Sequence, residues 1–249
     1  MTLLVQLVLG LLAAWYARRW CSVRGANPDE ASVGRLLAFM SGLVSLWVAV
    51  ASPLAQLDRW HLTAHMIQHL LIMTIAAPLL LLGEPVRILA SGRQPVSTVS
   101  LAWSFPHPAL CWLAGTLVVL VWHVPSVFEL GMRWHGLQHF TFLVGGLLFW
   151  LPVLEPYPFQ SRWPRWSVPL YLFLASLPCD VLSAFLAFCD RVVYAHYDAH
   201  CGPMALEDQQ RAGALMWFWV TIAYLVPATL VTVDLLTPRA RERLRPARG

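Results

Sequence analysis

The stretch HMIQHLLIMTIAAPLLLLGEP, from His65 to Pro85, decides the fold class. Extended back to His61, it gives a largely apolar run over 61–82, about the length that a helix needs to cross roughly 30 Å of hydrocarbon. The run ends at a Gly83-Glu84-Pro85 turn, and its first half carries histidines four residues apart. The stretch therefore predicts a membrane-spanning helix with polar side chains gathered toward one end.

The composition of the whole chain agrees with a membrane protein. Of 249 residues, 58% are apolar and 12% are charged, whereas an ordinary soluble domain has about 25% charged residues. These values exclude a soluble globular protein and a disordered chain. All 17 basic residues are arginines that lie scattered between apolar segments, so no basic face for nucleic acid is predicted.

The chain contains further apolar stretches of similar length. The predicted spans are 2–17, 34–52, 61–82, 108–124, 135–154, 167–189 and 210–236. The first is interpreted as an uncleaved span, because basic residues follow its apolar run rather than precede it. Pro78, Pro178 and Pro227 lie inside spans and predict kinks. We expect an all-α integral membrane protein, a single-domain bundle of seven transmembrane helices in contact with the lipid bilayer.

The arginines predict the orientation of this bundle, because arginines near span ends favour the cytoplasmic side. When alternate loops are assigned to one side, that side holds thirteen arginines: Arg18, Arg19, Arg24, Arg35, Arg87, Arg93, Arg162, Arg165, Arg239, Arg241, Arg243, Arg245 and Arg248. The other side holds Arg59, Arg133, Arg191 and Arg211. We therefore expect the N-terminus outside, and the basic tail over 237–249 in the cytoplasm.

This topology places eight of the nine histidines on the outer side and leaves His107 in the cytoplasm. The pairs His65 with His69 and His135 with His139 each share a helix face, because residues four apart are neighbours on a helix. His123 ends the fourth span, which runs outward. The candidate metal ligands are His65, His69, His123, His135 and His139, with His61 as a possible addition. The alternative for each ring is a role as an interfacial anchor.

Imidazole ligands suit copper, zinc and iron, and thioethers favour Cu(I). Met216 is a possible further ligand, although a methionine also fills a core well. Cys189 and Cys201 lie on the outer side and could bind metal, form a disulfide or remain unrelated thiols. The sequence leaves these alternatives open.

Three acidic residues are candidates for supporting roles. Asp180 lies inside the sixth span, where a carboxyl group is costly, and it either accepts a hydrogen bond from a liganding imidazole or pairs with another helix or an arginine. Asp190 is expected at the outer boundary as a cap or ion-pair partner. Asp208 is expected to begin the seventh span.

Several motifs resemble those of the multi-span CtaG family of cytochrome c oxidase assembly factors. These motifs are HMIQH at 65–69 with the APLLLLGEP turn, WHVP at 122–125 with Phe128, HGLQHF from His135, GGLLFWLP, DVLSAFLAFCD from Asp180 to Asp190 with Tyr194 and Tyr197, and DQQRAGALMW at 208–217. The matched histidines are His65, His69, His123, His135 and His139. His61, His107, His196 and His200 lie outside the motifs.

The resemblance implies a non-enzymatic protein of the bacterial inner membrane that helps to assemble a haem-copper oxidase and handles copper near the outer face. A subunit of that oxidase is the implied partner. Two other classes are kept as alternatives: an electron carrier holding haem between two histidines, and a metal or proton permease. The nearly apolar inner halves of the spans weigh against transport.

Overall fold

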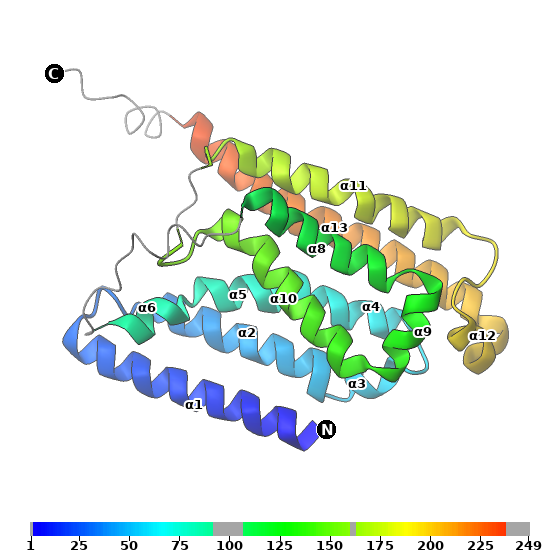
Figure 1. The fold of residues 1–249 in the computed structure, drawn as a ribbon, viewed down its shortest axis with the longest axis horizontal. Coiled ribbons are helices and arrows are strands. Elements are labelled where there is room, and N and C mark those ends of the chain that lie inside the picture. The colour runs from blue at the N-terminus through cyan, green and yellow to red at the C-terminus, as the bar shows by residue number, and fades with distance from the viewer. Residues whose placement is uncertain (1, 92–106, 160–162, 238–249) are drawn as a thin grey trace.

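The computed structural model describes residues 2–91, 107–159 and 163–237, and within these residues the chain is helical without a strand. Figure 1 shows the long helices side by side in an elongated bundle. The elements are α1 (Thr2–Ala26), α2 (Val33–Ala51), α3 (Leu54–Leu57), α4 (Leu62–Leu70), η1 (Leu71–Ala76), α5 (Ala77–Leu82), α6 (Pro85–Ala90), α8 (Pro108–Trp122), α9 (Pro125–Arg133), α10 (His135–Leu154), α11 (Ser167–Phe188), α12 (Ala195–Cys201), η2 (Gly202–Met204) and α13 (Ala205–Leu236). The predicted all-α class is confirmed.

Within the described residues, five helical segments are long and apolar enough to cross a membrane. They are Val33–Leu57, Leu62–Ala90, His135–Leu154, Ser167–Phe188 and Gly202–Leu236. The helices α8 and α9 together form a sixth candidate, with a bend of 87° between them. The predicted first span is helical, but α1 is not in this set, because its apolar part is short and is followed by Arg18 and Arg19. Five to six of the seven predicted spans are therefore supported.

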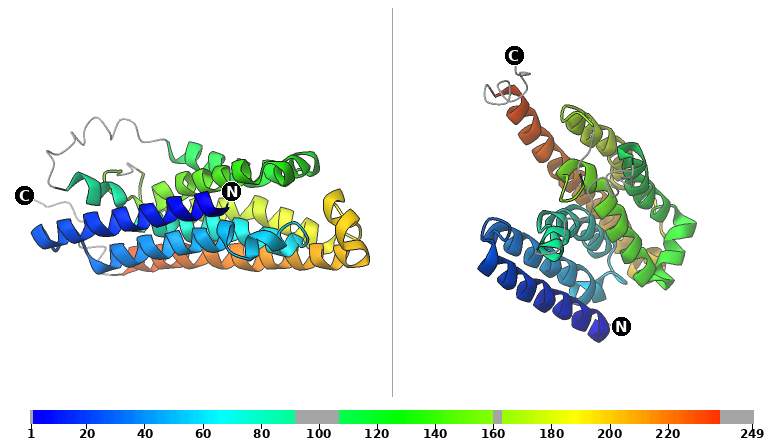
Figure 2. Two further views of the ribbon diagram at one scale, coloured as in Figure 1. Left: turned by 90° about the horizontal axis from the view of Figure 1, so that it is seen from below. Right: turned by 60° about the vertical axis from the view of Figure 1, so that its left-hand side comes forward.

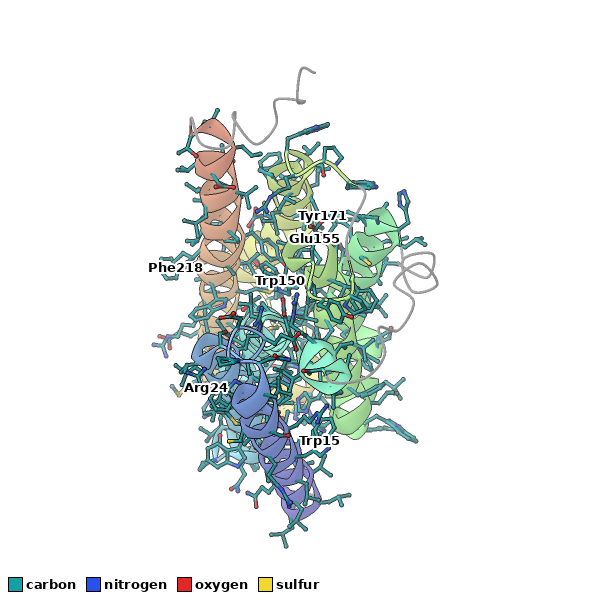
Figure 3. The ribbon with its side chains drawn as sticks, turned by 90° about the vertical axis from the view of Figure 1, so that its left-hand side faces the viewer. Trp15, Arg24, Trp150, Glu155, Tyr171 and Phe218 are labelled. Carbon is teal, nitrogen blue, oxygen red and sulfur yellow. The ribbon has the colours of Figure 1, made fainter. Side chains whose placement is uncertain are left out.

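The outward faces of the bundle carry large apolar side chains, as expected for helices in contact with lipid. Phe173, Val181, Phe188 and Phe218 are each at least 60% exposed on α11 and α13. Figure 3 shows Phe218 pointing away from the bundle and Trp150 lying within it. A soluble protein rarely exposes apolar surface on this scale, so these faces fit the hydrocarbon of a bilayer.

The short helices mark the two ends of the bundle. Figure 1 shows α3, α9 and α12 at one end and α6 at the other, and Figure 2 shows the same separation from another side. We call the first the histidine end, because the predicted outer histidines lie in or beside these helices, and the second the arginine end, because Arg18, Arg19, Arg24, Arg35 and Arg87 lie there. The arginine tail at 238–249 lies outside the described residues.

A π-helix, η1, separates α4 from α5. We attribute it to Pro78, which lies two residues after its end. Proline has no backbone N–H, so the carbonyls four and five residues before it lose their helical donor. The Met73 carbonyl, five residues before Pro78, instead accepts a hydrogen bond from the Trp150 indole at 2.8 Å. The structure thus has a π-helical turn just before Pro78, and α10 supplies a donor for its Met73 carbonyl. The kink expected at Pro78 itself stays a prediction.

α1 forms an outer layer on α2 and the turn after α5. The Tyr16 ring stacks on Phe39 with ring centroids 3.9 Å apart, and its hydroxyl donates to the Gly83 carbonyl at 2.7 Å. Trp20 and Val23 are buried in the same small core. These contacts tie α1 to the membrane-spanning part of the bundle.

Candidate functional site

α4 presents two imidazoles to the interior at the histidine end. His65 and His69 lie one helical turn apart, with ring centroids separated by 4.2 Å, and both residues are buried. Phe142 of α10 stacks on the His69 ring at 3.9 Å, while Phe128 of α9 lies 5.0 Å from the His65 ring. Aromatic rings from two other helices therefore fix the orientation of this pair.

The other three candidate histidines come from α10 and from the end of α8. The centroid of the His139 ring lies 6.1 Å from that of His69, and His135 lies a further 6.3 Å beyond His139. His123, at the residue that ends α8, lies 6.4 Å from His69 on another side. His69 is thus the common neighbour of rings from two other helices.

The imidazole nitrogens of this cluster largely lack partners. Both ring nitrogens of His65, both of His69 and the Nε2 atom of His139 are buried without a hydrogen bond. Buried polar groups are nearly always hydrogen-bonded in native proteins, because an unpaired one costs about 1–3 kcal/mol. Several such atoms therefore lie close together at the histidine end without a partner among the described residues.

His123 is held differently. Its Nδ1 atom lies 2.6 Å from the Val119 carbonyl, which can only accept a hydrogen bond, so Nδ1 carries the hydrogen. The Nε2 lone pair then faces the Met66 sulfur at 3.4 Å. A backbone carbonyl that fixes the tautomer in this way is the usual support for a metal-binding histidine.

His69 and His123 line a small internal chamber together with three methionines. Met66 and Met73 belong to α4 and η1, Met216 comes from α13, and the chamber has a volume of about 30 Å³. We call these five residues the thioether chamber. Phe142, Cys179 and Tyr224 also contribute to its wall.

A carboxyl group that the sequence reasoning missed lies beside His135. The Oδ2 atom of Asp58 is 3.5 Å from Nε2 of His135, a charge contact longer than a hydrogen bond, and Asp58 is 2% exposed. Burial raises the pKa of the Asp58 carboxyl, and the His135 ring opposes this shift. We call Asp58, His65, His135 and His139 the outer group. His135 lies at the histidine end, and its side chain is 16% exposed.

Two tyrosines brace the cluster from the segment around α12. Tyr197 donates a hydrogen bond to the Asp58 carbonyl at 2.5 Å, and Tyr194 donates to the His123 carbonyl at 3.2 Å. Both are fully buried, and Tyr194 also stacks on Phe128 at 4.1 Å. The tyrosines of the predicted motif thus hold the backbone of Asp58 and His123 without contacting a ligand position.

The remaining candidates lie outside the cluster. His61 is exposed at the start of α4, and Asp190 is exposed beyond the end of α11. Asp180 faces a separate cavity of about 220 Å³ between α11 and α13, where it is grouped with Ser176, Thr221 and Tyr224. Within the described residues no hydrogen bond joins Asp180 to an imidazole, so its expected support of a ligand is not what the structure presents.

Of the two cysteines considered as ligands or as a disulfide, the structure describes the side chain of only one. Cys189 is a half-buried free thiol, whereas the side chain of Cys201 lies outside the described part of the structure. His107 accepts a hydrogen bond from the Ala109 amide at the start of α8, at the arginine end. His196 contacts the Arg59 carbonyl through Nε2 at 3.0 Å. These two histidines are accounted for by backbone contacts.

Asp208 caps the N-terminus of α4 from the neighbouring helix α13. Its carboxylate accepts hydrogen bonds from the Leu62 amide at 2.6 Å and from the Thr63 hydroxyl at 2.7 Å. These donors lie at the first turn of α4, where amides have no partner within the helix. An acidic residue of α13 therefore caps the helix that carries His65 and His69.

We expect Asp208→Ala to lower the free energy of unfolding by about 1–2 kcal/mol, because it removes a charged cap and leaves buried donors unpaired. The loss is measurable as a lower melting temperature in detergent. Glu207→Ala is the matched control, since Glu207 makes only an exposed ion pair with Arg211 and should change stability little. Equal melting temperatures for the two variants would contradict the capping role.

No group of three or more His, Cys, Asp or Glu side chains among the described residues is positioned to close around a single metal ion. The potential donors that do approach one another include methionine sulfurs, such as the Met66 sulfur beside His123. A metal site here would combine imidazoles with thioethers or require a small adjustment of the rings.

A bundle of apolar helices with a buried polar cluster at one end defines a multi-span membrane protein. Residues 14–237 match the family model of the cytochrome c oxidase caa3 assembly factor (CtaG). The chain belongs to this family, so the resemblance in its motifs is confirmed.

Three curated relatives are uncharacterized proteins of Mycobacterium bovis, Mycobacterium tuberculosis and Mycobacterium leprae, to which the chain is 25%, 25% and 24% identical. Each match covers 95% of this chain but 38% of the relative, so the chain spans well under half of their length. No solved structure matches the chain.

Proposed function

We propose that this chain binds copper at its histidine end and delivers it to a haem-copper oxidase during assembly in the bacterial inner membrane. Family membership supports oxidase assembly. The observation that supports copper is the set of buried, unpaired imidazole nitrogens on His65, His69 and His139, contributed by two helices. The proposed ligands are His65, His69, His123, His135 and His139, with Met216 in reach of the same chamber.

The proposed topology has seven spans, with α1 as the first, the N-terminus outside and the tail in the cytoplasm. Its support is the contrast between the two ends of the bundle: the arginine end carries the basic residues, and the histidine end carries the cluster. In this orientation His135, whose side chain is 16% exposed, lies on the extracytoplasmic side of the outer group and is its proposed point of entry for copper.

Delivery requires that the bound copper ion can exchange from the ligands of this chain to those of the recipient. Neutral imidazoles and thioethers release copper more readily than a closed set of thiolates, so the donor set suits a transient carrier. The protein's own contribution is to keep the site dry and to hold each ring in place through Phe142, Val119 and the two tyrosines. No separate nucleophile and base are needed for such a role.

The size of the chamber favours copper over haem. A volume of about 30 Å³ is far below the several hundred Å³ that a macrocycle requires. Beyond the chamber, the described residues Ile72, Ala76, Ala77 and Leu172 are fully buried and apolar. This packing disfavours a polar route through the bundle and hence a permease.

The test is oxidase assembly in cells that produce His65→Ala or His139→Ala variants. We expect oxidase copper content and activity to fall at least about tenfold, as for the loss of a metal ligand. Membrane abundance of each variant is measured in parallel, and His107→Ala, at the arginine end, is the control. Normal copper content in the oxidase of both variants, at normal abundance, would overturn the proposal.

A further inference from the structure

The thioether chamber differs in donor chemistry from the outer group, and the two share a boundary at His69. The outer group offers imidazole nitrogens and the Asp58 carboxylate. The chamber is lined by Met66, Met73 and Met216 together with His69 and His123, and no carboxylate is among the described residues that line it. We propose that the chamber is a separate site selective for the cuprous ion, Cu(I). This inference rests on the proposed copper function and narrows it to an oxidation state and a position.

The closest pair of donors has the spacing of two ligands on one ion. In a first-row metal site, metal–nitrogen bonds of about 2.0 Å and metal–sulfur bonds of about 2.3 Å place the two ligand atoms about 3.5 Å apart at a tetrahedral angle. His123 Nε2 and Met66 Sδ lie 3.4 Å apart. Because the Val119 carbonyl fixes the hydrogen on Nδ1, a nitrogen lone pair faces a sulfur lone pair, an arrangement that an electrophile between them would stabilise.

The π-helix contributes a second methionine, Met73, to the wall of the chamber. η1 begins at Leu71, two residues after His69, and Met73 lies within this π-turn with 7% exposure. The backbone is fixed on both sides, since Trp150 donates to the Met73 carbonyl and the Trp219 indole donates to the Thr74 hydroxyl, each at 2.8 Å. π-turns are rare and frequent at functional sites. Here the turn holds Met73 against the chamber.

The charge of the donors favours a monovalent ion. Neutral imidazoles and thioethers surround the chamber, and a buried divalent ion would lack compensating negative charge. Thioethers are soft ligands that prefer Cu(I), whereas Cu(II) prefers tetragonal nitrogen and oxygen ligands, and Zn(II) favours thiolates, imidazoles and carboxylates. The outer group has the nitrogen and oxygen donors that suit the harder ions. His69 is close to both and provides a shared ligand through which Cu(I) can pass from one set to the other.

The test uses the chain of 249 residues purified in detergent under anaerobic conditions. Cu(I) is titrated against a chromophoric Cu(I) chelator, and Ag(I) serves as a redox-inert probe. We expect Met66→Leu and Met216→Leu each to weaken Cu(I) and Ag(I) binding at least about tenfold, or by one decade in Kd. Binding of Zn(II) should change less than about twofold. Met204→Leu, at a residue 64% exposed, is the control.

Leucine nearly conserves the volume of methionine, so these variants should fold, and their melting temperatures check this. X-ray absorption of the Cu(I)-loaded wild-type chain gives an independent readout that needs no variant. It should show sulfur scattering at about 2.3 Å together with nitrogen at about 2.0 Å.

The outcomes separate the two proposals. If copper binds with nitrogen scattering alone and is lost in His65→Ala or His139→Ala but kept in Met66→Leu and Met216→Leu, the chamber is not the Cu(I) site and the proposed function stands. If Zn(II) binds in the chamber as tightly as Cu(I), the selectivity is overturned. If the chain binds no copper in any state, both proposals fail.

Discussion

Replacing His69 with leucine is expected to abolish stoichiometric copper binding and to leave the metal-free protein as stable as the wild type or more stable. His69 belongs to the thioether chamber, and its ring lies beside those of His65 and His139 in the outer group, so its loss removes a chamber ligand and the link between the two sets. Both of its ring nitrogens are buried without a partner. An apolar side chain of similar size removes that penalty, which is worth about 1–3 kcal/mol for each buried unpaired group.

The measurement is a pair of melting curves for each protein, one without copper and one with copper at about 100 times the Kd. The wild-type chain should gain about 2.7 kcal/mol from the ligand, whereas His69→Leu should gain nothing. His107→Leu, remote from the cluster, should keep the full gain. A variant that is strongly destabilised without metal, or that still gains stability with copper, would contradict the assignment of His69 as a ligand held in an unfavourable metal-free state.

Helix positions were largely predictable from the sequence, because apolar length is a direct requirement of the bilayer. The span predicted at 135–154 coincides with α10, and the one at 167–189 differs from α11 by one residue. The predicted bounds of the first span differ more from the structure, since α1 continues as helix to Ala26 through Arg18 and Arg19. Apolar length predicts the part of a helix that lipid requires, whereas the helix itself extends further where tertiary contacts such as that of Tyr16 support it.

The proximity of the histidines was also predictable, because helical spacing and alternating topology require it. Asp58 was not, since its place beside His135 depends on the turn that follows α3 at the histidine end, and a turn carries no periodic signal. A carboxyl group seven residues before His65 was the available clue.

For Asp180, the sequence indicates how deep the residue lies in its span but not the direction in which its side chain points. Its depth in the sixth span made a contact with the imidazoles one of the two expectations. One residue along a helix corresponds to about 100° of rotation, and it is Cys179 that faces the chamber while Asp180 faces the cavity between α11 and α13. Depth follows from counting along a span, but the direction of a side chain follows from packing, which a single sequence does not specify for a helix that is apolar on all sides.

Substituting Gly213 with alanine is expected to destabilise the bundle by about 2–4 kcal/mol, and Gly213→Leu is expected to prevent folding. A Cβ atom at this position would lie 2.6 Å from the Ala187 amide nitrogen and 2.9 Å from the Ser183 carbonyl oxygen. Both are backbone atoms of α11, which cannot rotate away as a side chain can. Close approach of two backbones through a small residue is the way that membrane helices pack tightly, so the whole α11–α13 contact depends on the missing side chain.

The consequence reaches the proposed copper site, because α13 contributes Met216 to the chamber wall and Asp208 to the start of α4. A separation of α11 and α13 should therefore weaken Cu(I) binding as well as lower the melting temperature. Gly10→Ala is the matched control: nothing lies within 4 Å of a Cβ atom there, and alanine in the middle of α1 should raise stability by up to about 1 kcal/mol. If Gly213→Ala and Gly10→Ala melt alike, the tight α11–α13 contact does not determine the stability of the bundle.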